Sequence, residues 1–350
     1  MCRLLLAQRL LPCADYLEGY CLPEGNSLPD SRHKAIAFAP ADNKQLVINN
    51  KDKMKDLYQK YFPNFQQVQI TTTSTTINAL VGGEGPPLLL LHGYPQNLLM
   101  WRKVAPSLAA NFTVIVSDLR GYGKSGKPDT DEQHLPYSKR VMAQDQVDLM
   151  LALGHQTFML AGHDRGARVA HRLALDHAKR ITKLIILDIL PTLQLYRETD
   201  MSFATQYWHW FFLIQPYPLP EMLLGKNVDF MAQAIFAKLV KSGAVTTDVL
   251  AAYKKNFSNP KALRASCEDY RAGATIDLLH DEADIDKKIL CPTLVLWGAQ
   301  NLVYQKKEMI KEWQKKAIQV TGQSMNSGHF ITEEVPEDTI SIFEEFLKNK

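Results

Sequence analysis

Short apolar runs recur along the chain from residue 67 onward and alternate with stretches of helical spacing. Pro87–His92 reads Pro-Leu-Leu-Leu-Leu-His, and such a run is typical of a strand buried on both faces. Helical patterns at Lys139–Leu153, Ala167–His177 and Lys306–Lys316 follow the same alternation, which predicts an α/β fold with a mostly parallel sheet. The eight expected strands are Gln67–Thr72, Ile77–Val81 (an antiparallel opening pair), Pro87–His92, Thr113–Asp118, Phe158–Gly162, Leu184–Asp188, Thr293–Gly298 and residues 317–321.

The alternation stops between Pro191 and about Asp286, where aromatic residues and helix formers dominate. We expect a helical cap there, inserted after the sixth strand and lying over the carboxyl edge of the sheet, where ligands of such folds bind. Residues 1–55 hold three of the five cysteines and scattered Pro and Gly, which favours an extension, partly disordered. The expected parts are an N-terminal extension (1–55), a first core segment (56–190), the cap (191–286) and a second core segment (287–350).

Composition narrows the classes of protein. The 350 residues are 46% hydrophobic and 22% charged with a net charge of +3, which is ordinary globular usage. The balanced charge gives no reason to expect nucleic acid or an acidic membrane surface as a partner, and no apolar run is long enough for a membrane span. The five cysteines include no C-x-x-C pair, so we expect no disulfide framework or zinc site and a cytoplasmic location. Because Arg9 interrupts the apolar start, we do not interpret it as a signal peptide.

Gly162-His163-Asp164-Arg165-Gly166 lies between an expected strand and an expected helix. This context is that of a nucleophile elbow, with Asp164 where many hydrolases carry Ser. A carboxylate with an ordinary pKa of about 3.9 is ionised at neutral pH and attacks carbon without a base. On the motif alone, Asp164 is equally well explained as a cap of the following helix.

The expected base and its orienting acid follow strands that end at the same edge of the sheet as Asp164. His329, in Ser327-Gly328-His329-Phe330, follows the last expected strand and is the candidate base. The segment after the seventh strand holds no acid, whereas the sixth strand ends in Asp188. Since a charge that closes a buried run needs a partner, Asp188 is the expected orienting acid, the alternative being a simple strand-end residue.

Arg165 and Arg168 lie three residues apart at the start of the expected helix, so both side chains can share one face. Two guanidinium groups beside a helix N-terminus form a strong anion site, which suits a substrate carboxylate held over Asp164. The alternative is structural pairing with another acid, such as Asp188 or Asp118.

From about Asp56 to its end, the chain resembles the haloacetate (fluoroacetate) dehalogenases of the α/β-hydrolase superfamily. The resemblance implies a catalytic triad of Asp164, His329 and Asp188 and a carboxylate clamp of Arg165 and Arg168. It also implies a halide pocket of His209, Trp210 and Tyr270 on the cap, with Trp208 in the cap core and the backbone N–H groups of Tyr94 and Arg165 as oxyanion donors. The segments that carry the resemblance are His92–Gln96, Asp118–Ser125, Gly162–Arg168, Leu187–Thr192, Tyr207–Trp210, Gln215–Glu221, Cys267–Gly273 and Gly328–Phe330.

The resemblance implies a cofactor-free and metal-free hydrolase that converts haloacetate and water to glycolate and halide through an aspartyl ester. Its expected partner is a small haloacid, with a homodimer as a candidate assembly. One alternative is an epoxide hydrolase with the same Asp-His-Asp chemistry, against which Arg165 argues. The other is a non-catalytic protein of this fold that binds a small acid.

Overall fold

The computed structural model describes residues 50–301 and 308–349. Most of the expected extension, residues 1–55, therefore lies outside the described residues, as does the start of the expected helix at Lys306–Lys316. The first described element is α1 (Asn50–Tyr61), which runs across the expected boundary at residue 56.

Within the described residues, eight strands form one sheet in the order β1-β2-β4-β3-β5-β6-β7-β8. The pairs β1–β2 and β2–β4 are antiparallel, and all other neighbouring strands are parallel. The predicted mostly parallel sheet is therefore confirmed. The strands are β1 (Gln66–Thr71), β2 (Thr76–Gly82), β3 (Pro87–Leu91), β4 (Thr113–Ser117), β5 (Phe158–His163), β6 (Ile181–Leu187), β7 (Thr293–Gly298) and β8 (Val320–Met325).

Alternation along β3 shows why the sheet is covered on both faces. Leu88 and Leu90 pack in one core cluster, and Leu89 and Leu91 pack in the other, because successive side chains of a strand point to opposite faces. One cluster includes side chains of α3 (Lys139–Ala152) and α4 (Arg165–Asp176), and the other includes α1, α2 (Ala105–Leu108) and α16 (Pro336–Lys348). The short helices η1 (Leu98–Trp101), η2 (Leu135–Tyr137), α14 (Met309–Gln314) and α15 (Ile331–Glu334) lie in the connections.

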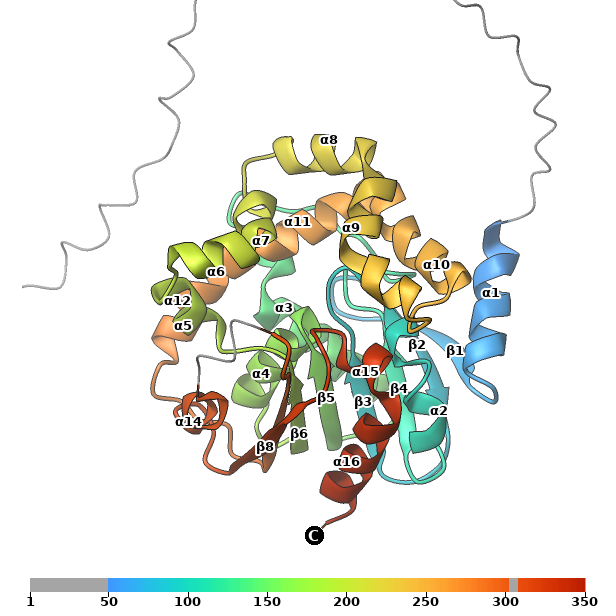
Figure 1. Ribbon diagram of the computed structural model, residues 1–350. Coiled ribbons are helices and arrows are strands. Elements are labelled where there is room, and N and C mark those ends of the chain that lie inside the picture. The colour runs from blue at the N-terminus through green and yellow to red at the C-terminus, as the bar shows by residue number, and fades with distance from the viewer. Residues whose placement is uncertain (1–49, 302–307, 350) are drawn as a thin grey trace, which may run out of the picture. The chain divides into compact units, whose positions relative to one another are not determined.

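Between β6 and β7 the chain forms helices only. Figure 1 shows them grouped over one edge of the sheet. Side chains from this segment and from the loops after β5 and β7 line one cavity, so the helices cover the carboxyl ends of those strands. None of the helices in the described part of the chain is long and apolar enough to cross a membrane. The inserted helices are α5 (Thr192–Arg197), α6 (Met201–Gln206), α7 (Trp208–Leu213), α8 (Leu219–Lys226), α9 (Val228–Lys241), α10 (Thr247–Ser258), α11 (Pro260–Ala274) and α12 (Ile276–Ala283).

Candidate active site

Asp164 lies on a strained turn between β5 and α4. Its φ of 48° and ψ of −116° place a residue with a side chain where glycine is favoured. No residue with a side chain fits at the position of Gly166, because an added Cβ would lie 2.3 Å from the carbonyl oxygen of His92. The Asp164 side chain makes no capping hydrogen bond to α4. The simple helix-cap interpretation is therefore wrong, and the turn presents the carboxylate as a nucleophile elbow does.

Three strand ends bring Asp164, His329 and Asp188 together. Nδ1 of His329 lies 2.5 Å from Oδ2 of Asp188, and Nε2 of His329 lies 3.9 Å from Oδ2 of Asp164. Asp188 also accepts hydrogen bonds from the backbone N–H of Gly298 (2.7 Å) and from Nδ2 of Asn301 (3.1 Å). A proton on Nδ1 is therefore held by Asp188, and Nε2 faces the Asp164 carboxylate.

Neighbouring charges shift the pKa values of Asp164 and His329 in opposite directions. Burial raises the pKa of Asp164, but His329, His163, Arg165 and Arg168 together outweigh it, so that pKa lies below its ordinary value. Burial lowers the pKa of His329, but the hydrogen bond and charge of Asp188 and the charge of Asp164 outweigh it, so that pKa lies above 6.5. Asp164 is therefore ionised at neutral pH, and its charge together with that of Asp188 stabilises the protonated form of His329.

The cluster opens into a cavity of about 500 Å³ between the sheet edge and the inserted helices. The backbone N–H of Tyr94, one of the two predicted oxyanion donors, donates to Oδ1 of Asp164 at 2.8 Å. The other predicted donor, Arg165, is the first residue of α4. The cavity is lined by Tyr94, Pro95, Asp164, Gln206, Tyr207, Trp208, His209, Met231, Ala234, Ile235, Tyr270, Gln300, Asn301, His329 and Phe330.

Two of the three predicted halide-pocket residues line this cavity. Burial lowers the pKa of His209 to about 4, so the ring is neutral at pH 7 and carries one N–H donor. Burial and the charge of Asp164 raise the pKa of Tyr270, which keeps its phenol protonated. Trp210 is 1% exposed, and its ring lies 6.2 Å from that of Tyr270, behind the cavity wall. Trp208, expected in the cap core, is 49% exposed and lines the cavity, so that expectation is wrong.

Both predicted clamp arginines are held by protein groups and are absent from the cavity lining. Arg165 donates from Nε and Nη2 to the Asp269 carboxylate at 3.1 and 2.8 Å, and its guanidinium lies 4.2 Å from the Tyr270 ring centre. Arg168 donates to the carbonyl of Leu190 and the hydroxyl of Thr192. The alternative of a structural pairing with another acid is therefore confirmed for Arg165, although the acid is Asp269 and neither Asp188 nor Asp118.

Three supporting residues were not predicted from the sequence. Asp269 and Lys139 form a buried ion pair beside Arg165, and Asp269 lies on α11, 104 residues from Arg165 in the chain. His163 donates from Nε2 to the carbonyl of His329 at 2.7 Å and so positions the loop that carries the base. The motif around Asp164 contains His163 and the segment around Tyr270 contains Asp269, but no local pattern indicates these long-range contacts.

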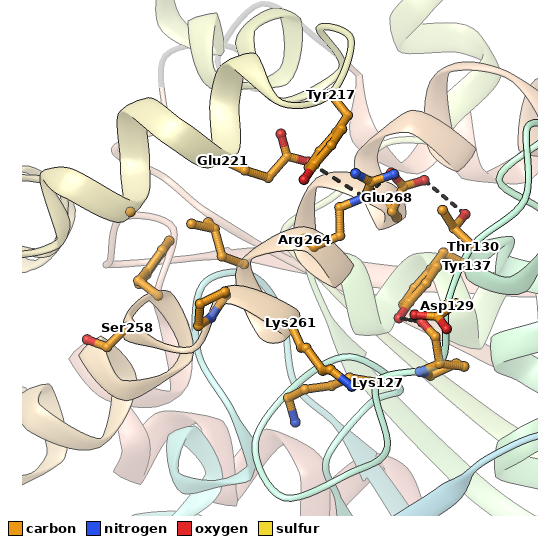
Figure 2. Close-up of a pocket in the computed structure, with 15 residues that line it drawn as sticks. Lys127, Asp129, Thr130, Tyr137, Tyr217, Glu221, Ser258, Lys261, Arg264 and Glu268 are labelled. Carbon is orange, nitrogen blue, oxygen red and sulfur yellow. Dashed lines mark hydrogen bonds and ion pairs between the residues drawn. The ribbon is translucent and has the colours of Figure 1, made fainter.

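A second cavity, of about 510 Å³, lies between the inserted helices and the loop after β4 (Figure 2). It contains none of the predicted site residues, and its arginine, Arg264, pairs with the lining acids Glu221 and Glu268. Arg264 lies 2.8 Å from Glu268 and 3.8 Å from the ring centre of Tyr217, and Glu268 also accepts a hydrogen bond from Thr130. In the described part of the chain, no three His, Cys, Asp or Glu side chains are grouped to hold a metal ion.

The mostly parallel sheet, the inserted helices and the cluster of Asp164, His329 and Asp188 at the strand ends are the arrangement of a hydrolase of the α/β-hydrolase fold. A family model described as the alpha/beta hydrolase fold matches residues 86–335. A fluoroacetate dehalogenase from Burkholderia sp is 43% identical over 82% of this chain and 95% of its own length. The chain belongs to the haloacetate dehalogenase family within the α/β hydrolases, which confirms the resemblance.

Two further proteins are similar to this chain. A soluble epoxide hydrolase from Corynebacterium sp. (strain C12) is 32% identical over 75% of this chain and 90% of its own length. A crystal structure of a provisionally assigned alpha/beta hydrolase from Nostoc sp PCC 7120 is 52% identical, covers 82% of this chain and 99% of its own, and has a TM-score of 0.80.

Proposed function

We propose that the chain hydrolyses the carbon–halogen bond of short 2-haloacids, converting haloacetate and water to glycolate, halide and a proton. One observation carries the proposal: an ionised, buried Asp164 carboxylate faces His329, which Asp188 orients. The similarity to a fluoroacetate dehalogenase supports the choice of substrate class.

In the first step, Oδ2 of Asp164 attacks the halogen-bearing carbon and the halide leaves with the electron pair of that bond. Oδ2 is the attacking atom because Oδ1 is held by the backbone N–H of Tyr94. The departing halide is received by the hydrogen-bond donors of His209 and Tyr270, the two predicted halide-pocket residues that line the cavity. Each hydrogen bond to a charged acceptor contributes about 1.5–3 kcal/mol, so these donors lower the barrier substantially.

In the second step, neutral His329 takes a proton from water, whose oxygen attacks Cγ of the Asp164 ester. The negative charge that develops on Oδ1 is stabilised by the N–H groups of Tyr94 and Arg165. The tetrahedral intermediate collapses to the Asp164 carboxylate, glycolate receives the proton from His329, and the second water proton goes to solvent. Esterification also removes the Asp164 charge that raises the pKa of His329, which favours the neutral base when it is needed.

The substrate carboxylate is assigned to Arg165 and Arg168. Arg165 uses Nε and Nη2 for Asp269, and its Nη1 group makes no hydrogen bond to a described residue. The guanidinium of Arg168 lies 4.6 Å from the ring centre of Trp210, so both cations sit against predicted halide-pocket rings. In this proposal, the positive charges of both arginines, which also act on Asp164, attract the substrate carboxylate to the Asp164 side of the cavity.

Epoxide hydrolysis is the second candidate, and one observation favours it. Two tyrosines of the inserted helices, Tyr207 and Tyr270, line the cavity and are suited to protonate an alkoxide. Arg165 directly after the nucleophile argues for an acidic substrate instead. Assays of chloroacetate and styrene oxide side by side separate the two, because turnover of styrene oxide without halide release from chloroacetate would contradict the dehalogenase proposal.

The proposal is tested by ion chromatography of halide released from fluoroacetate and chloroacetate. His329→Asn is then expected to accumulate an ester, seen as a mass increase of the intact protein, since only the second step needs the base. Binding of haloacid with no halide release by the wild-type enzyme over hours would favour the non-catalytic alternative.

We also propose a homodimer formed through the exposed apolar side of α8. Leu219, Met222 and Leu223 on this helix are 49%, 55% and 49% exposed, which is unusual for large apolar side chains in a monomer. Leu223→Lys is expected to shift the mass measured by light scattering from dimer to monomer, and a monomeric wild type would contradict the assembly. The cytoplasmic location stays a prediction.

A further inference from the structure

A third cavity, of about 560 Å³, shares no lining residue with the catalytic cavity. Its wall is formed by α1, the first strand, the loop after β4, the end of α10 and the start of α11. The lining residues are Met54, Lys55, Gln67, Gln69, Asn97, Gly123, Lys124, Lys127, Ala252, Lys255, Asn256, Asn259 and Ala262.

Four lysines from three separate segments converge on this cavity, and no carboxylate lines it among the described residues. Lys55 comes from α1, Lys124 and Lys127 from the loop after β4, and Lys255 from α10. None of the four forms an ion pair with a described residue.

Two of these lysines are half-buried and fixed. The ammonium group of Lys127 donates to the carbonyls of Gly123 (3.0 Å) and Ser125 (2.8 Å). The ammonium group of Lys124 lies 4.6 Å from the ring centre of Tyr58. Neutral partners hold both groups in place without cancelling their charge, so the positive potential stays in the cavity.

The nearest acid, Asp118, acts on Lys124 and Lys127 from behind the cavity wall and offsets only part of this charge. Asp118 is fully buried, and its two oxygens accept hydrogen bonds from the backbone N–H groups of Leu98 and Lys124 and from Nδ2 of Asn78. Burial and the like charge of Lys255 lower the pKa of Lys124 against the opposing effect of Asp118. Asp248, beyond the end of this cavity, is already paired with Lys60.

Uncharged donors add to the lysines. Asn97 is 2% exposed, and its Oδ1 accepts the N–H of Leu99, while its Nδ2 group makes no hydrogen bond to a described residue. Asn259 is the N-cap of the 15-residue helix α11, whose positive dipole end therefore faces the same space. The cavity of Figure 2 shares Lys127 with this one, but it is also lined by Glu221 and Glu268, and its Arg264 is paired with Glu268.

We propose that this cavity binds a small phosphorylated compound that carries two or more negative charges. Four ammonium groups against the single buried carboxylate of Asp118 leave a surplus of positive charge that more than one negative charge is needed to balance. Ammonium groups bind phosphate oxygens as point charges from several directions, whereas a planar carboxylate is matched best by the fork of an arginine. The volume lies within the range of small-molecule sites, and the Nδ2 groups of Asn97 and Asn259 supply further hydrogen-bond donors.

The proposal is tested by calorimetric titration of the full chain with pyrophosphate at low ionic strength. Saturable binding at one site is expected, and Lys124→Gln and Lys255→Gln should each weaken it at least about fivefold. Lys241→Gln, which removes one exposed lysine at the end of α9, is the matched control and should leave the affinity unchanged. Pyrophosphate should also leave the KM for chloroacetate unchanged.

Four results would overturn the proposal. Absence of binding at millimolar pyrophosphate would remove the site, and equal weakening by Lys241→Gln would reduce the binding to general surface charge. Competition with chloroacetate would move the anion to Arg165 and Arg168 in the catalytic cavity. Citrate that binds as tightly as pyrophosphate would show that multivalent charge alone is selected and would contradict the phosphate assignment.

Discussion

Replacing Asp269 by Asn tests whether Arg165 is positioned by a buried acid. The Asp269 side chain is 0% exposed and accepts hydrogen bonds from Arg165 and from the hydroxyl of Tyr122 (2.8 Å), besides its ion pair with Lys139. The substitution removes one negative charge and leaves two buried cations behind. Lys139 keeps a second acid, Asp277, at 3.3 Å, whereas Arg165 loses the carboxylate that anchors it.

The expected loss of stability follows from this difference between Lys139, which keeps an acid, and Arg165, which does not. Removing one partner of a buried ion pair costs about 3–5 kcal/mol, and the remaining Lys139–Asp277 pair places this case near the lower end. A loss of about 3 kcal/mol lowers the Tm by roughly 4 °C for a chain of this size. A guanidinium displaced from the nucleophile by about 1 Å lowers kcat/KM for chloroacetate by about 10²-fold.

The assays are urea unfolding and steady-state halide release, with Asp286→Asn, a substitution of an exposed acid, as the matched control. The charges of Arg165 and Lys139 outweigh burial and hold the pKa of Asp269 well below its ordinary value, so its contribution to stability is present above about pH 4. The difference in the free energy of unfolding between wild type and variant should therefore be constant from pH 5 to 8 and become smaller in stronger acid. A loss below about 1 kcal/mol together with an unchanged KM would refute this account of Arg165.

Three further predictions concern the reacting groups. The rate of hydrolysis of the Asp164 ester should rise with pH as His329 loses its proton. Asp188→Asn should move this rise to lower pH, because Asp188 raises the pKa of His329. Stopped-flow pH profiles that coincide for wild type and variant would contradict this role of Asp188. Arg168→Lys should raise the KM for chloroacetate several-fold, since a point charge does not replace a planar fork, and an unchanged KM would remove Arg168 from the clamp. His209→Phe should slow the halide burst by about 10- to 100-fold through loss of one donor, and an undiminished burst would exclude His209 from halide binding.

The sheet was predicted well because its central strands are continuous apolar runs. The last strand was placed at residues 317–321, whereas β8 is Val320–Met325, so that placement is wrong. Its burial alternates and it carries only one fully buried side chain, Met325, so the sequence holds no apolar run to mark it.

The sequence predicted that the inserted segment is helical, but it did not predict which side chains of these helices face the cavity. Trp208 and Trp210 are two residues apart on α7, so a helix turns them to different sides, and the sequence does not say which side meets the cavity. The Arg165–Asp269 and Lys139–Asp269 contacts join residues more than a hundred positions apart. Such pairs depend on how the inserted helices pack on the core, which local patterns do not encode.

The central claim is that Asp164 bonds to the substrate carbon and that water then attacks the side chain. A single turnover with excess enzyme in ¹⁸O-labelled water tests it directly. The account predicts unlabelled glycolate and one ¹⁸O atom in the peptide that contains Asp164, because the alcohol oxygen comes from the carboxylate. Labelled glycolate with an unlabelled peptide would show that water attacks the carbon itself and would contradict the account.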